Sequence, residues 1–277
     1  MLAPLLLGAC AARAEPPAWT PDEVRLVQWH GPWPPRRRAA PPPALVGLGE
    51  RLFYDPRLSG NGSLLCASCH VPYRAFQDGR PLARGLAQAE RNTPSLLNVG
   101  FFRRYGWDGG RASLAAQSLR PLLEPREMGS SKAHVAAVLR SYYGASGSDA
   151  ELFELAGRAL AAFQRTLVSG RTPFDEFRDS LAGADIAAPA YPEAAQRGLK
   201  HFIHRCSSCH AGPLFTSGAI ARGLRVPTLR NVAATAPYMH DGSVASLEQA
   251  VRHDEATLGA AQVAELVEFL KTLSAAP

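Results

Sequence analysis

The pentapeptide Cys-Xaa-Xaa-Cys-His occurs twice in the chain, at residues 66–70 and 206–210, and uses four of the five cysteines. In this pattern the two thiols add across the vinyl groups of a haem, and the histidine that follows takes an axial position on its iron. A chain that attaches haem at two points must fold around both, so the motifs predict two haem-bound cores. The attachment residues would be Cys66, Cys69 and His70 for the first haem, and Cys206, Cys209 and His210 for the second.

Zinc is the competing interpretation of paired cysteines. A zinc site would bring both pairs to one ion, or would add histidines at zinc-finger spacing. The first cysteines of the two motifs are 140 residues apart (206 minus 66). This separation favours two independent sites over one shared ion.

The start of the chain predicts export. Residues 1–10 are apolar but too short to span a membrane, and Ala12-Arg13-Ala14 resembles a signal-peptidase site, which makes residues 1–14 the predicted signal peptide. The usual positively charged start is missing, and the run that ends at Cys10 resembles a lipobox, so lipid attachment through Cys10 is an alternative. We expect a periplasmic protein without a transmembrane span, because bacteria attach haem to such motifs outside the cytoplasm.

The net charge of +6 raises the question of nucleic-acid binding. The only basic run is Arg36-Arg37-Arg38, which prolines flank on both sides, and no aromatic residues are interleaved with it. This composition predicts that the basic run is stiff and solvated, within a Pro/Arg-rich entry segment over residues 15–43. It disfavours nucleic acid and favours the docking of an acidic redox partner.

An internal duplication extends beyond the haem motifs. Pro94 precedes Asp108 by 14 residues, and Pro227 precedes Asp241 by the same 14. Apolar residues at helical spacing precede each motif, and no long strand pattern occurs. The stretch 180–193, rich in Ala, Gly and Pro, separates the repeats. The predicted domains are therefore residues 44–185 and 186–277.

Four motifs between about Leu45 and Leu273 resemble the bacterial di-haem cytochrome c peroxidases and their MauG-type relatives. The motifs are Leu52–Ser59, Trp107–Gly109, Glu127–Gly129 and Ala236–Gly242. The resemblance implies a mainly α fold of two cytochrome c-like haem domains related by the internal duplication. It also implies that the N-terminal haem meets peroxide while the C-terminal haem takes in or stores an electron.

The resemblance assigns three catalytic roles around the first haem. Glu127 matches the family's proton-transferring group, Gln117 the residue that orients peroxide, and Trp107 the indole that relays electrons between the haems. Pro121 cannot ligate iron, so the face of the first haem opposite His70 is open to a small molecule. Leu86 occupies the position of the histidine that blocks this iron in many of the family's peroxidases, which predicts a haem ready without reductive activation.

The sixth ligand of the second haem has more than one candidate. The family uses Met or Tyr at the position of Asp254, and carboxylate is an uncommon haem ligand. His253, the preceding residue, is one candidate, and water or an open position is another.

Further binding residues follow from the resemblance. The side chain of Asn92 and the carbonyls of Thr235 and Pro237 match a Ca²⁺ site, which hard oxygen ligands suit. Alternatively, Asn92 caps a turn. Arg230 is expected to pair with a haem propionate, because a guanidinium suits a carboxylate.

These features predict a periplasmic c-type peroxidase that reduces hydrogen peroxide with electrons from a cytochrome c or a cupredoxin. A MauG-type oxidase that modifies Tyr or Trp of a partner protein is the first alternative; Leu86 favours it, and Asp254 in place of Tyr disfavours it. An electron carrier without peroxide turnover is the second. Glu127 and Gln117 argue against a carrier, which gains nothing from a catalytic pocket.

Overall fold

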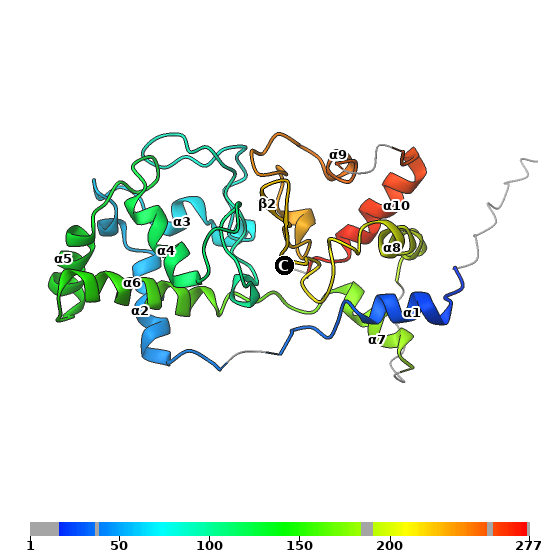
Figure 1. The fold of residues 1–277 in the computed structure, drawn as a ribbon, viewed down its shortest axis with the longest axis horizontal. Helices are drawn as coiled ribbons and strands as arrows, with labels where there is room; N and C mark the ends of the chain where they lie inside the picture. The colour runs from blue at the N-terminus through cyan, green and yellow to red at the C-terminus, as the bar shows by residue number, and fades with distance from the viewer. Residues whose placement is uncertain (1–16, 37–38, 184–190, 254–256, 276–277) are drawn as a thin grey trace, which may run out of the picture.

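Two pairs of crossed helices form the frame of the protein, one pair in each half (Figure 1). The computed structural model describes residues 17–36, 39–183, 191–253 and 257–275. The first half contains α2 (Pro43–Phe53), α3 (Cys66–Cys69), α4 (Leu114–Leu123), α5 (Lys132–Tyr143) and α6 (Asp149–Gln164). The second half contains α7 (Pro173–Leu181), α8 (Glu193–Arg205), α9 (Leu247–Ala250) and α10 (Ala260–Lys271), and α1 (Pro21–Gln28) packs on it.

Short elements connect these helices. They are the 3₁₀ turns η1 (Pro56–Leu58), η2 (Pro72–Arg74), η3 (Val99–Phe101) and η4 (Val232–Ala234), and the antiparallel strands β1 (Ile220–Ala221) and β2 (Leu224–Arg225). The mainly α fold predicted from the sequence is confirmed.

The crossed pairs are α2 with α6 and α8 with α10, and a glycine lies at each crossing. A Cβ atom at Gly49 would overlap the carbonyl oxygen of Ala159, and one at Gly198 would overlap that of Glu265. Each helix therefore touches its partner through backbone, which only glycine allows.

Gly198→Ala is expected to lower the free energy of unfolding by about 1–3 kcal/mol, because the added methyl group forces α8 away from α10. Urea denaturation measures the change. Gly47→Ala is the control: a methyl group at this α2 glycine would meet no atom within 4 Å, so the substitution should stabilise the helix by about 0.5–1 kcal/mol. Equal effects of the two substitutions would contradict the role of the crossing.

The duplication is visible in matched backbone contacts. Asn98 and Asn231, which are 133 positions apart (231 minus 98), both have left-handed backbones, with φ of 65° and 61°. Asn98 donates its N–H to Leu167 at 2.7 Å, and Asn231 donates to Leu273 at 3.0 Å. Both acceptors follow the last helix of their half. The predicted internal duplication is therefore confirmed.

The first part of the predicted entry segment belongs to the second core, whereas Pro34, Arg36, Ala39 and Ala40 beside the basic run are exposed. Val27 is fully buried with Phe174 and Phe177 of α7, and His30 and Trp33 are buried as well. The amphipathic face of α1 drives this packing. Because α7 also lies in this core, the change from first to second core comes before α7 and not near residue 185.

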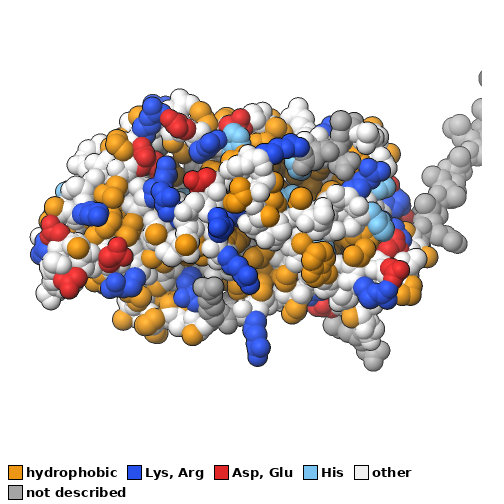
Figure 2. Space-filling view, in the orientation of Figure 1, with side chains coloured by type: hydrophobic (Ala, Val, Ile, Leu, Met, Phe, Trp, Pro, Cys, Tyr) orange, Lys and Arg blue, Asp and Glu red, His pale blue; other side chains and the backbone are white. Residues whose placement is uncertain are grey.

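None of the helices in the described residues is both long and apolar enough to cross a membrane. The expected leader, with Cys10, lies outside the described residues, so export stays a prediction. Figure 2 shows Lys and Arg side chains at several separate places on one face of the protein, with acidic side chains among them.

Candidate haem sites and distal pocket

The histidines of the two motifs make matching contacts through Nδ1. His70 Nδ1 lies 3.0 Å from the carbonyl oxygen of Phe76, and His210 Nδ1 lies 3.2 Å from that of Phe215. Both phenylalanines have a positive φ, 58° and 51°. A histidine that binds metal commonly donates its other ring N–H to a carbonyl, which fixes the ring and leaves Nε2 as the ligand atom. Both histidines therefore fit the axial role.

A cavity of about 550 Å³ lies beside the first motif. Its size is in the range typical of cofactor pockets. Its lining includes the motif residues Cys66, Cys69 and His70, and the predicted distal residues Trp107, Gln117, Pro121 and Glu127. These motif and distal residues, up to 61 positions apart in sequence (127 minus 66), therefore meet around one cavity of cofactor size.

Gln117 projects into this cavity from α4, which begins at the N-cap Ser113. Its Oε1 atom is buried and has no hydrogen-bond partner in the described chain. An unsatisfied buried acceptor costs about 1–3 kcal/mol. The amide oxygen is thus positioned to accept a hydrogen bond from a ligand in the cavity.

Glu127 follows α4 in a turn in which its N–H bonds to the carbonyl of Glu124 at 3.0 Å. Burial raises the pKa of its carboxyl group above the ordinary value, while the charge and hydrogen bond of Arg120, at 2.9 Å, partly oppose the rise. A carboxyl group with a raised pKa exchanges its proton more readily near neutral pH. Glu127 is therefore suited to move a proton in the cavity.

Comparisons with known proteins place the chain among haem enzymes. Residues 43–182 match the family model described as di-haem cytochrome c peroxidase. The chain belongs to this family. It is 33% identical to the methylamine utilization protein MauG of Methylorubrum extorquens, over 85% of this chain and 79% of that protein. It is 30% identical to cytochrome c551 peroxidase of Nitrosomonas europaea, over 83% of this chain and 80% of that protein.

Solved structures agree with this assignment. The crystal structure of a MauG-like protein associated with microbial copper homeostasis superposes with a TM-score of 0.71, at 29% identity, over 93% of this chain and 96% of that one. The protein is accordingly a haem-dependent oxidoreductase of the di-haem cytochrome c peroxidase family. Because its relatives include both peroxidases and MauG proteins, membership does not choose between these two roles.

Leu86 lies on a loop that covers the Glu127 turn. Its N–H donates to the carbonyl of Glu127 at 3.0 Å, and Ala87 donates to Arg126 at 3.0 Å. A Cβ atom at Gly85 would come within 2.5 Å of both carbonyl oxygens, so this close approach requires glycine. The Leu86 side chain is partly exposed and does not line the cavity.

Trp107 lies where the two halves of this di-haem protein meet. Its indole Nε1 donates to the carbonyl of Asn92 at 2.8 Å, and its own carbonyl accepts the N–H of Arg225 at 2.7 Å. The N–H of Asn92 donates to His240 at 2.9 Å. In the duplication, Asn92 corresponds to Arg225 and Trp107 corresponds to His240. The bond from Arg225 to Trp107 and the bond from Asn92 to His240 are therefore the same contact made once in each direction. The halves thus meet as a pseudo-twofold pair, with Trp107 at the junction.

Of the predicted calcium ligands, Asn92 lies at this junction. Asn92 donates its side-chain amide to the carbonyl of Arg80 at 2.7 Å, and the hydroxyl of Thr235 donates to Val232 at 3.0 Å. Pro237 lies three positions before His240, whose carbonyl accepts the N–H of Asn92. Calcium binding by these groups stays a prediction.

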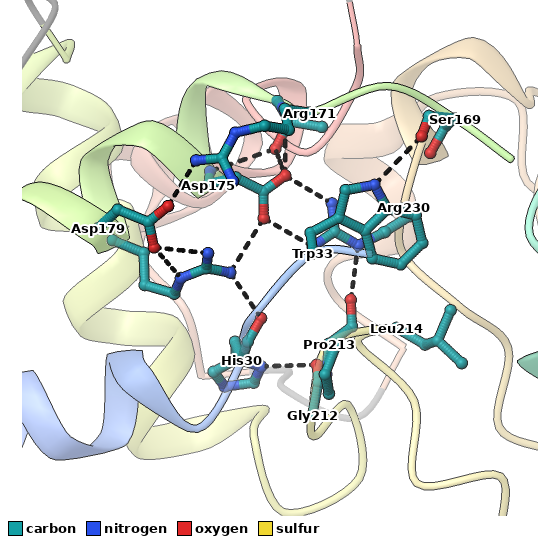
Figure 3. Close-up of polar contacts among 12 residues, drawn as sticks. His30, Trp33, Ser169, Arg171, Asp175, Asp179, Gly212, Pro213, Leu214 and Arg230 are labelled. Atoms are coloured by element: carbon teal, nitrogen blue, oxygen red, sulfur yellow. Dashed lines mark hydrogen bonds and ion pairs between the residues drawn. The ribbon is translucent and has the colours of Figure 1, made fainter. Parts of the chain in front are cut away.

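Arg230 pairs with a protein carboxylate (Figure 3). Its guanidinium donates to both oxygens of Asp175, at 2.9 and 2.8 Å, and both side chains are fully buried. Trp33 lies against it, with its ring centroid 3.7 Å from the guanidinium carbon. Contact with a haem propionate stays a prediction; in this structure the terminal guanidinium nitrogens bond to Asp175 instead.

The rest of this buried cluster was not predicted from the sequence. Arg178 donates to Asp175 at 3.1 Å, and the buried His30 bonds through Nδ1 to Gly212 at 3.2 Å. Burial, together with the charges of the two arginines, lowers the pKa of His30 to about 4, so its ring is neutral. The one local signal was the capping box of Thr172 and Asp175, which marks the start of α7 but not its distant partners.

The second motif lies in the other half of the protein, with His210 buried next to Phe215. Its neighbour His253 follows α9, whereas Asp254 lies outside the described residues. Within the described ranges, no group of three or more His, Cys, Asp or Glu side chains could hold a metal ion.

Proposed function

We propose that the protein is a periplasmic di-haem c-type peroxidase that reduces hydrogen peroxide to water with electrons from a small redox protein. The observation that supports this most is the cavity beside Cys66, Cys69 and His70, which Gln117 and Glu127 also line. This cavity combines the first haem motif with the Gln117 Oε1 atom, which has no hydrogen-bond partner in the described chain, and with the Glu127 carboxyl group, whose pKa is raised.

The haem held by His70 would supply the iron that binds peroxide and the electrons that cleave its O–O bond. Gln117 accepts a hydrogen bond from the bound peroxide through Oε1 and orients it. Glu127, as the carboxylate, takes the proton of one oxygen and passes it to the other, which then leaves as water. Arg120 holds the Glu127 carboxylate in place. With two electrons and two protons supplied, each peroxide gives two molecules of water.

The haem held by His210 would receive the electrons. Trp107 lines the cavity of the first haem and bonds across to the chain segment that meets the second half, which suits an electron relay. Pro121, on the cavity side of α4, offers no donor or metal ligand that would compete with peroxide.

The test is the electron paramagnetic resonance spectrum of the ferric protein before and after adding peroxide, followed by turnover with reduced cytochrome c. We expect a high-spin signal from one haem that peroxide removes within the mixing time, and steady oxidation of the cytochrome. Two low-spin haems that are inert to peroxide in either redox state would refute the proposal.

A MauG-type oxidase is the second candidate, and the placement of Leu86 favours it. The loop of Leu86 is bonded to the backbone of Glu127, and the Leu86 side chain does not line the cavity. Such a protein would consume peroxide while oxidising Tyr or Trp of a partner protein. Rapid reaction with peroxide but no turnover with several reduced cytochromes and cupredoxins would select this candidate.

Trp107→Phe is expected to slow electron transfer between the haems while leaving both attached. The variant loses the indole and its bond to Asn92, which should lower the free energy of unfolding by only about 1 kcal/mol. Freeze-quenched spectra after peroxide addition measure oxidation of the second haem. Trp29→Phe, at an exposed position, is the control and should behave as wild type. Normal oxidation of the second haem in Trp107→Phe would exclude the relay.

A further inference from the structure

Comparison of the two repeats shows which residues of the second half occupy the positions of the distal-pocket residues Gln117 and Arg120. Helix α9 is the counterpart of α4, since both begin at a serine N-cap 133 positions apart (246 minus 113). The counterpart of Gln117 is Ala250, which has no polar side chain, and that of Arg120 is His253. The second half therefore carries an imidazole where the first carries a cavity-lining guanidinium.

The ring of His253 lies close to that of His210. Their centroids are 6.3 Å apart and their planes are inclined at 86°. When two imidazoles bind one metal from opposite sides, each bond is about 2 Å and each nitrogen lies about 1 Å from its ring centre, so the centres lie about 6 Å apart. The observed separation thus corresponds to two rings that share one metal between them.

Both rings are held through the same nitrogen. His210 Nδ1 lies 3.2 Å from the carbonyl oxygen of Phe215, and His253 Nδ1 lies 2.9 Å from that of Ala250. A carbonyl at Nδ1 fixes the tautomer in which Nε2 carries the lone pair for a metal. The two histidines are therefore prepared for ligation in the same way.

The local backbone holds His253 in this position. Val251, which packs against the second core, donates its N–H to Leu247 at 3.0 Å. Arg252 donates through its guanidinium to the carbonyl of Leu258 at 2.7 Å, and Leu258 is buried in the same core. The turn after α9 is thus anchored on both sides of the histidine.

We propose that His253 is the second axial ligand of the C-terminal haem, opposite His210. This inference rests on the proposed function insofar as it needs a haem at the second motif. A haem with two histidine ligands is six-coordinate and does not bind peroxide. It also has a lower potential than one with a methionine ligand, because methionine raises the potential. The two haems would then differ in their distal side alone: a polar pocket at the first and an imidazole at the second.

Electron paramagnetic resonance and near-infrared magnetic circular dichroism of the ferric holoprotein test this assignment. Perpendicular imidazole planes leave two iron orbitals nearly degenerate, so wild type should give one highly anisotropic low-spin signal and a charge-transfer band typical of two nitrogen ligands. In His253→Gln the low-spin signal should be lost and the high-spin intensity should double. In His253→Met a low-spin signal should return with a sulfur-to-iron band and a higher potential.

His204→Gln, on the exposed side of α8, is the control and should leave every spectrum unchanged. A wild-type protein that is high-spin at both haems would overturn the assignment, and so would a low-spin signal that persists in His253→Gln. If a variant binds no haem, the wild-type near-infrared band alone decides between nitrogen, sulfur and oxygen ligation. Loss of peroxide reactivity at the high-spin haem would refute the peroxidase proposal but leave the ligand assignment standing.

Discussion

Replacing Glu127 with glutamine is expected to slow the reaction with hydrogen peroxide by about 10²- to 10⁴-fold, the usual contribution of a general acid–base group. Glutamine has nearly the same shape and can still bond to Arg120, so the cavity should persist. What the variant loses is the ability to accept a proton. Stopped-flow mixing of the ferric protein with peroxide measures the rate constant.

The pH dependence identifies the carboxyl group responsible. Glu127 must be ionised to accept the first proton, so the rate should rise as pH increases through its pKa. Burial raises that pKa above the ordinary value of about 4.3 for glutamate, and the acid limb of the profile should shift upward accordingly. The limb should be absent in Glu127→Gln.

Glu124→Gln separates this role from a general effect of charge. Glu124 shares Arg120 with Glu127, at the longer distance of 3.7 Å, and its negative charge contributes to the raised pKa of Glu127. Its removal should move the acid limb to lower pH and leave the plateau rate within a few-fold of wild type. An equal loss of rate in both variants would show that neither carboxylate acts as the base.

Asp175→Asn is expected to lower the free energy of unfolding by about 3–5 kcal/mol, the cost of breaking a buried ion pair from one side. The Asp175 carboxylate bonds to Arg230 and Arg178, whose side chains are 0% and 2% exposed. An amide cannot neutralise the buried guanidinium of Arg230, whereas Arg178 keeps its ion pair with Asp179 at 2.6 Å. Chemical denaturation monitored by circular dichroism measures the loss.

Acid titration provides a second measurement. Burial raises the pKa of Asp175. The hydrogen bonds and charge of Arg230, together with the hydrogen bonds of Thr172, lower this pKa by a larger amount, so the net shift is downward. A lowered pKa in the folded state stabilises the protein above the unfolded value of about 3.9, and this stabilisation is lost as pH falls through the folded value. Asp175→Asn should lack this part of the acid dependence.

Asp149→Asn is the matched control. Asp149 bonds to Arg140 at 2.7 Å, but both side chains are about half exposed. Exposed pairs contribute about 0–1 kcal/mol. Equal destabilisation by the two substitutions would show that burial is not what makes Asp175 important.

Much of the candidate site could be predicted from sequence, because its chemistry is local. The haem motifs place two thiols and an imidazole within five residues, so the attachment points need no knowledge of the fold. The 133-position repeat is a property of spacing, and the structure reproduces it in the matched bonds of Asn98 and Asn231. Glu127, Gln117 and Trp107 were predicted by resemblance, and the structure brings all three to one cavity.

The amino-acid sequence by itself determined two haem motifs, a mainly α fold and its duplication, since each depends on residues close together in the chain. Only the tertiary structure decided that Asp175 joins Arg230, 55 positions away, and that Trp33 lies on the same guanidinium. It also brought His253 to His210, at a separation that suits one metal. Buried ion pairs and paired imidazoles depend on how distant helices pack, and no local spacing records that packing.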